Sequence, residues 1–144
     1  MGCRPGIISF GKILKKYLSE GLVPKAWWTC GGCYTLAQAL HEYLGDDRTE
    51  IWGVGSPFAG TAYHVVVKAG DCFLDAEGAS TKEELLERWK KKFPNQFLIC
   101  RKLTEKEKQV LFCGEPPGPS LEEVRDRLDL EFGASELLWR RFFS

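Results

Sequence analysis

A cysteine, a histidine and an aspartate occur in an order that suits nucleophilic catalysis. Cys33 follows two glycines, Gly31 and Gly32, and begins a helical pattern that runs to Leu44. A helix N-terminus carries partial positive charge and unpaired N–H groups, which together favour a thiolate. The two glycines permit a sharp turn and a close approach of the backbone to a substrate. Cys33 is therefore the candidate nucleophile.

The other two candidates lie on predicted strands at residues 63–68 and 72–74, which read as a hairpin. A turn centred between residues 69 and 70 places His64 directly opposite Asp75, so that both side chains share one face. A carboxylate beside a histidine fixes its tautomer and stabilises the imidazolium. We therefore expect His64 to act as general acid and base, with Asp75 orienting it.

The helix that begins at Cys33 should point its sulfur at a packing partner. Cys33 shares a helical face with an apolar stripe made of Leu36, Ala37, Leu40, Tyr43 and Leu44. We expect this helix to pack on an antiparallel sheet that presents His64 and Asp75. The oxyanion donors would be the backbone N–H of Cys33 and the indole of Trp28. The substrate cleft would be formed by Trp28, Gly31, Gly32 and Tyr34.

The remaining pattern predicts an α+β fold with about four strands. Two helices are expected from apolar patterns, over residues 7–18 and 135–143. Three more should begin at the capping boxes Ser80/Glu83 (a helix that runs to Lys92), Thr104/Glu107 and Ser120/Glu123. Two further strands are expected at 49–54 and 96–101. We expect a single domain spanning 1–144, with a catalytic core at 1–113. A helical C-terminal extension at 120–144 would pack on this core, or its aromatic residues would bind a protein partner.

The composition disfavours several functional classes. The 20 basic and 20 acidic residues cancel, so a strongly basic surface and a nucleic-acid partner are not expected. The apolar runs are shorter than the roughly 20 residues that a membrane span requires. The first residues lack the order of a secretory signal, so we expect a cytoplasmic protein with six reduced cysteines.

Cys30 and Cys33 allow two other chemistries. A dithiol redox pair at a helix start is typical of thioredoxin-like proteins, but residues 22–28 do not read as the strand that should precede it. A zinc site could combine these cysteines with His64 or Cys72, but no second Cys-x-x-Cys motif is present. The structural alternative is that Cys33 is simply a small buried apolar residue. Because neither the redox pattern nor the zinc pattern is complete, we expect no metal and no cofactor.

The order of Cys33 on a helix, His64 on a strand and Asp75 on the following strand resembles the papain-like superfamily in its transglutaminase-like branch. That branch includes arylamine N-acetyltransferases and related bacterial peptidases. The matching stretches lie between residues 28 and 78, about a third of the chain. The resemblance implies a Cys-His-Asp triad in a hydrolase or acyltransferase that acts on an amide, isopeptide or thioester bond of a protein, peptide-like or small acyl substrate.

This sequence departs from the family in one respect, because His64 and Asp75 are closer together than is usual. The short hairpin and the small chain argue against a complete acetyltransferase. Size alone suggests an accessory protein of a bacterium or phage. The alternative function is a non-catalytic interaction protein that keeps the papain-like fold.

Overall fold

The computed structural model describes residues 3–19, 33–57, 62–111 and 120–143. The described chain is an α+β protein built on a five-stranded antiparallel sheet with the strand order β4-β3-β2-β1-β5. The strands are β1 (Glu50–Gly55), β2 (His64–Ala69), β3 (Cys72–Asp75), β4 (Gly78–Ser80) and β5 (Ile99–Lys102). The α+β class is confirmed. The sequence-based estimate of about four strands missed β4, because three residues are too few to show a period.

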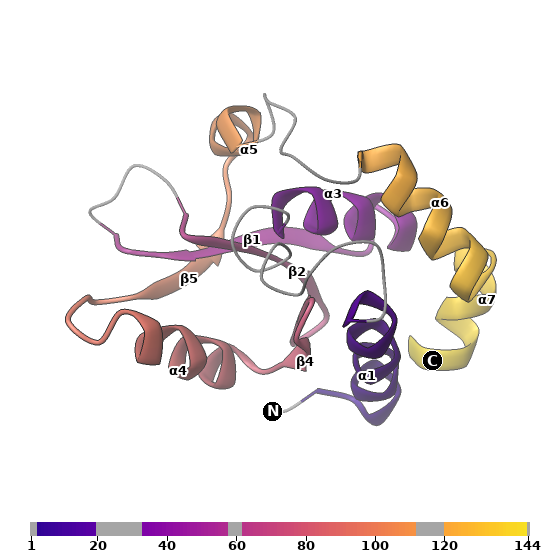
Figure 1. Cartoon of the computed structure of the whole chain (residues 1–144), viewed down its shortest axis with the longest axis horizontal. Coiled ribbons are helices and arrows are strands. Elements are labelled where there is room, and N and C mark those ends of the chain that lie inside the picture. The colour runs from indigo at the N-terminus through magenta and orange to yellow at the C-terminus, as the bar shows by residue number, and fades with distance from the viewer. Residues whose placement is uncertain (1–2, 20–32, 58–61, 112–119, 144) are drawn as a thin grey trace.

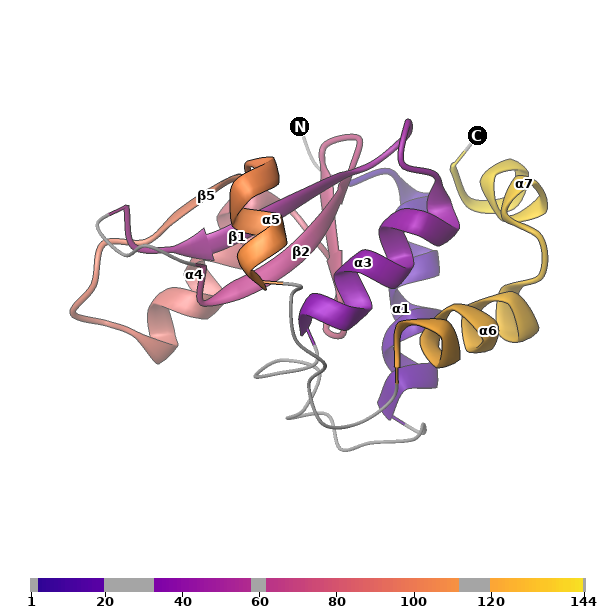
Figure 2. The ribbon, with the colours of Figure 1, turned by 90° about the horizontal axis from the view of Figure 1, so that it is seen from above.

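Helices cover both faces of the sheet (Figure 1). They are α1 (Pro5–Ser19), α3 (Cys33–Leu44), α4 (Lys82–Lys92), α5 (Glu105–Leu111), α6 (Leu121–Phe132) and α7 (Ser135–Leu138), followed by a π-helical turn (Trp139–Phe143). Figure 2 shows α3 lying along β1 and β2, with α6 and α7 on its outer side. Helix α4 lies on the opposite face of the sheet (Figure 1).

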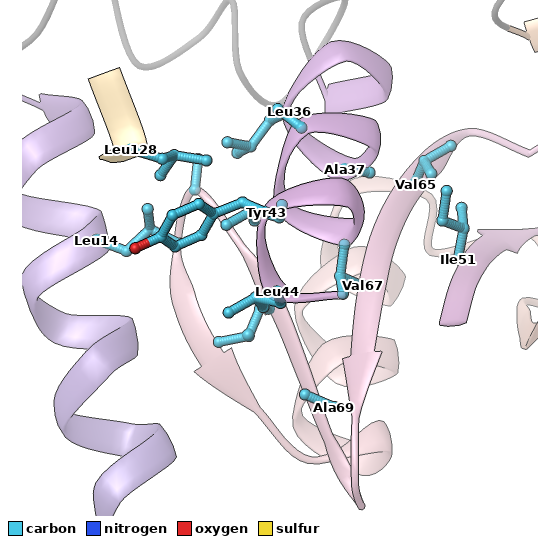
Figure 3. Packing of buried hydrophobic residues seen from close by; sticks show 14 of the residues in the cluster. Leu14, Leu36, Ala37, Tyr43, Leu44, Ile51, Val65, Val67, Ala69 and Leu128 are labelled. Atoms are coloured by element: carbon cyan, nitrogen blue, oxygen red, sulfur yellow. The ribbon is translucent and has the colours of Figure 1, made fainter. Parts of the chain in front are cut away.

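Alternation along the strands divides the apolar residues between these two faces. The face toward α3, here the α3 face, receives Ile51, Val65, Val67 and Leu74. Figure 3 shows Ile51, Val65 and Val67 gathered beside the helix. The other face, here the α4 face, receives a second cluster, which comprises Val54, Val66, Phe73, Leu85, Trp89 and Cys100. Burial on both faces explains why the β2 sequence reads as a continuous apolar run instead of an alternating one.

The β2–β3 hairpin turns one residue later than predicted. Ala69 pairs with Cys72 and Val67 with Leu74, so the two turn residues are Gly70 and Asp71. Gly70 has a φ of 64°, and Asp71 has a negative φ, because no residue other than glycine has a positive φ in the described ranges. A positive φ at the first turn residue only is the pattern of a type II′ turn, which favours glycine at that position. The prediction that His64 directly faces Asp75 is therefore wrong by two residues. A two-residue shift keeps every side chain on its predicted face.

Helix α4 also begins one residue later than predicted. Its capping box uses Thr81 and Glu84: the Glu84 N–H donates to the Thr81 hydroxyl and the Thr81 N–H donates to the Glu84 carboxylate. Ser80, the predicted cap, is instead the last residue of β4. The capping boxes predicted at Thr104 and at Ser120 are present.

The N-terminal helix is fastened to the far edge of the sheet. Gly11 of α1 lies so close to β4 that a Cβ there would meet the Ala79 nitrogen at 2.5 Å. A disulfide joins Cys3 to Cys72 of β3. The expectation that all six cysteines are reduced is therefore wrong.

The C-terminal helices pack against α1 and α3. Phe10 of α1 contacts Phe132 and Phe142 through ring centroids 4.9 and 5.7 Å apart. The Trp139 indole donates a hydrogen bond of 2.6 Å to the Leu44 carbonyl at the end of α3. These contacts place aromatic residues of the 120–144 extension in the main apolar cluster.

No helix in the described ranges combines the length and the apolar character needed to cross a bilayer.

Candidate functional site

The structure brings His64 and Asp75 together in the interior. Nε2 of His64 lies 2.8 Å from Oδ2 of Asp75, and the two side chains are only 1% and 4% exposed. His64 is the first residue of β2 and Asp75 the last residue of β3. In the observed register Asp75 falls opposite Val66, so the pair lies on a diagonal of one sheet face and not directly across.

Asp75 is held as a carboxylate by three donors. Its Oδ2 also accepts a hydrogen bond from Nη2 of Arg88 at 2.8 Å, and its Oδ1 accepts from the Glu77 backbone N–H at 2.9 Å. Burial acts to raise the pKa of Asp75, but the hydrogen bond and charge of His64, the charge of Arg88 and the Glu77 amide together hold it below its ordinary value.

An ionised Asp75 fixes the proton on His64. A carboxylate only accepts hydrogen bonds, so Nε2 must be the nitrogen that carries hydrogen, and in the neutral ring Nδ1 is then a lone-pair acceptor. Within the described part of the chain, Nδ1 is buried and has no hydrogen-bond partner. A buried acceptor without a partner costs free energy, so a hydrogen-bond donor brought to this nitrogen would be stabilised there.

Two residues of α4 complete the surroundings of His64. The Trp89 ring stacks on the imidazole with centroids 4.6 Å apart and planes 22° apart. Arg88 bridges two strands, donating to Asp75 and, through Nη1 at 3.0 Å, to the Ser80 hydroxyl. The sequence offered no signal for either role, because adjacent residues on a helix show no pattern that ties them to a distant strand.

Cys33 is a buried thiol at the first residue of α3, 2% exposed. It belongs to the apolar cluster on the α3 face, together with Val65 and Val67. His64 instead shares the α4 face, because it pairs with Val54 of that cluster. The helix does pack on the sheet as expected, but the sheet turns His64 and Asp75 toward α4.

The start of α3 and the start of β2 nevertheless lie at the same end of the molecule. Tyr34, next to Cys33, donates a hydrogen bond of 3.3 Å to the carbonyl of Ala62, two residues before His64. This contact holds the first turn of α3 beside the residues that lead into β2.

A second buried thiol lies on the same sheet face as His64. Cys100 of β5 and His64 both pair with Val54, on either side of β1. Burial raises the pKa of Cys100 to about 11, with a smaller opposing effect from Lys82. Cys100 is therefore a protonated core residue at neutral pH.

Two sets of residues remain, namely the predicted site residues outside the described ranges and His41, the other histidine of the chain. Trp28, Cys30, Gly31 and Gly32 lie outside the described residues. His41 is hydrogen-bonded through Nδ1 to the Thr49 hydroxyl at 2.6 Å, and burial, together with the charge of Lys108, lowers its pKa. Among the described residues, no three His, Cys, Asp or Glu side chains converge as metal ligands would.

Comparison of the chain with models of protein families, with curated proteins and with solved structures gave no match.

Proposed function

We propose that this protein is a cysteine hydrolase or acyltransferase with Cys33 as nucleophile, His64 as general acid and base, and Asp75 as the residue that orients His64. The observation that carries the proposal is the buried His64–Asp75 pair, which presents an acceptor lone pair on Nδ1 with no hydrogen-bond partner among the described residues. The helix-on-sheet arrangement and the order of the three residues agree with a papain-like or transglutaminase-like fold, which is part of this proposal.

The chemistry follows from that lone pair. Nδ1 of His64 takes the thiol proton of Cys33, and the sulfur attacks the carbonyl carbon of an amide, isopeptide or thioester. The imidazolium, stabilised by Asp75, returns its proton to the leaving amine or thiol as the tetrahedral intermediate collapses to an acyl-enzyme. Water or a second nucleophile, deprotonated by His64, then releases the acyl group. The substrate is a protein, a peptide-like molecule or a small acyl compound.

The proposal requires the sulfur and Nδ1 to meet at the beginning of β2. The contact between Tyr34 and Ala62 supports this placement, because it holds the first turn of α3 beside the residues that lead into His64.

Alkylation by iodoacetamide at about pH 6, read by peptide mass spectrometry, tests the assignment. A Cys33 thiolate paired with imidazolium reacts at this pH, whereas the internal control, Cys100, stays protonated because its pKa is raised to about 11. We expect selective labelling of Cys33 that is lost in His64→Ala and reduced in Asp75→Asn. Equally slow labelling of all thiols in the folded protein would contradict the assignment. An acyl-enzyme trapped on Cys33 then identifies the substrate class.

A second candidate is a non-catalytic interaction protein of the same fold. Two observations favour it: Cys33 of α3 packs in the cluster on one face of the sheet whereas His64 lies on the other face, and Arg88 shares the Asp75 oxygen that binds His64. Under this reading His64, Asp75 and Arg88 only fasten α4 to the sheet. The two candidates differ in outcome, since His64→Ala would then lower stability and leave the reactivity of Cys33 unchanged.

A further inference from the structure

We infer that Arg88 is a positioning residue that fixes the tautomer and orientation of His64 by acting on Asp75. This inference rests on the proposed function in one respect, namely that the reactivity of Cys33 depends on His64. The fixing of the imidazole itself stands on the geometry of α4, β2 and β3.

His64 and Arg88 share one carboxylate oxygen of Asp75. Oδ2 of Asp75 accepts hydrogen bonds from both Nε2 of His64 and Nη2 of Arg88, each at 2.8 Å. Oδ1 accepts from the Glu77 N–H, so both oxygens are held and the carboxylate cannot rotate without breaking a bond. A carboxylate held in this way presents one fixed lone-pair direction to Nε2.

Arg88 is itself held in place by hydrogen bonds to two strands. Its Nη1 donates to the Ser80 hydroxyl at 3.0 Å while its Nη2 binds Asp75, so the planar guanidinium joins the ends of β3 and β4. Its side chain is 30% exposed, whereas that of Asp75 is 4% exposed. The guanidinium of Arg88 is thus bound to two strands, although the side chain as a whole stays partly exposed. A lysine at this position would keep the charge but could not form the same two-pronged contact.

The charged groups around His64 also favour the tautomer with hydrogen on Nε2. The groups that face His64 are Asp75 from β3, Arg88 and the Trp89 ring from α4, and, across Val54 of β1, the protonated Cys100 of β5. Lys92 lies over Trp89, with its Nζ 4.3 Å from the ring centroid. Arg88 is a cation bonded directly to Asp75, and its charge adds to the hydrogen bond from His64 in keeping that carboxylate ionised. Because the carboxylate cannot hold the proton, Nε2 must, and Nδ1 remains free to accept one.

The experiment compares Arg88→Gln with Lys91→Gln, which removes one positive charge from an exposed position of the same helix. In wild type, ¹⁵N NMR over a series of pH values should show a pyrrole-like Nε2 of His64 throughout, because Nε2 carries hydrogen in both the neutral and the protonated ring, and a pyridine-like Nδ1 wherever the ring is neutral. We expect Arg88→Gln to lose this single-tautomer signature and to label Cys33 on the order of 10-fold more slowly. Lys91→Gln should behave as wild type.

Two milder variants keep the test decisive if Arg88→Gln fails to fold. Arg88→Lys keeps the cation and should restore part of the signature, whereas Ser80→Ala removes one anchor of Arg88 and should weaken the signature without changing any charge. An unaltered tautomer signature in folded Arg88→Gln would overturn the inference, as would an equal change in Lys91→Gln. A changed signature with unchanged Cys33 labelling would overturn the link to reactivity.

The two proposals fail separately. If wild-type Cys33 is not labelled selectively, the proposed function is lost, and the NMR comparison still decides whether Arg88 fixes His64.

Discussion

Nε2 of His64 lies 2.8 Å from Oδ2 of Asp75 although the two residues are not partners in the β2–β3 ladder. The partner of Asp75 in that register is Val66, one step along the same face from His64. The diagonal separation is spanned because both side chains lean toward each other and Arg88 holds the carboxylate in place. Each of the following predictions probes one contact that positions this pair or the elements around it.

Asp75→Asn should lower the free energy of unfolding at pH 7 by about 3 kcal/mol, because it removes the anion from a buried ion pair. The pKa of Asp75 is depressed in the folded protein, so its contribution is fully present above its unfolded value of about 3.9 and is lost as the pH falls through the folded value. Urea denaturation at pH 7 and at pH 3 should therefore separate wild type from Asp75→Asn widely at pH 7 and less widely at pH 3, which lies below the unfolded value.

Asp71→Asn is the matched control, since Asp71 is an exposed carboxylate in the adjacent turn. It should change stability by less than about 0.5 kcal/mol at both pH values. An Asp75→Asn protein as stable as this control at pH 7 would show that the buried pair contributes no net stability.

Gly11→Ala should destabilise the protein by about 2 kcal/mol, although alanine is the better helix former by up to about 1 kcal/mol. The added Cβ would lie 2.5 Å from the Ala79 nitrogen and 2.8 Å from its Cβ, so α1 would be pushed away from β4. Thermal unfolding measures the effect. Ser9→Ala at an exposed position of α1 is the control and should be neutral or slightly stabilising; a stabilised Gly11→Ala would mean that α1 and β4 are not in this contact.

Cys3→Ser should cost about 4 kcal/mol in the chain-entropy description, because the Cys3–Cys72 disulfide closes a loop with a sequence separation of 69. Urea denaturation of wild type and variant measures the difference. Non-reducing peptide mapping should recover residues 3 and 72 in one cross-linked pair. Finding both residues alkylated in separate peptides of the unreduced protein would count against the disulfide.

Trp139→Phe should cost about 1–2 kcal/mol, because the Leu44 carbonyl loses its indole donor in a partly buried position. Chemical denaturation of wild type and variant measures this loss in the free energy of unfolding. Leu137→Ala is the control from the same segment, since Leu137 is 60% exposed and should contribute little. Equal effects of the two changes would show that the extension is not fastened through Trp139.

The sequence by itself determined the elements that depend on local periodicity and capping. The apolar stripes of α1 and α3, the capping boxes at Thr104 and Ser120, and the apolar β2 run are all properties of neighbouring residues. It also determined that His64 and Asp75 share a face, because face depends only on parity, and parity is unchanged by the two-residue shift in strand register.

Only the tertiary structure decided which helix covers the sheet face that carries His64 and Asp75. The β2 sequence is apolar on both sides, so its pattern could not show whether α3 or α4 would cover His64. The answer came from Trp89 and Arg88, which reach His64 and Asp75 from a helix that follows them in the chain. Long-range packing and charge pairing placed these groups, and neither leaves a periodic trace in the sequence.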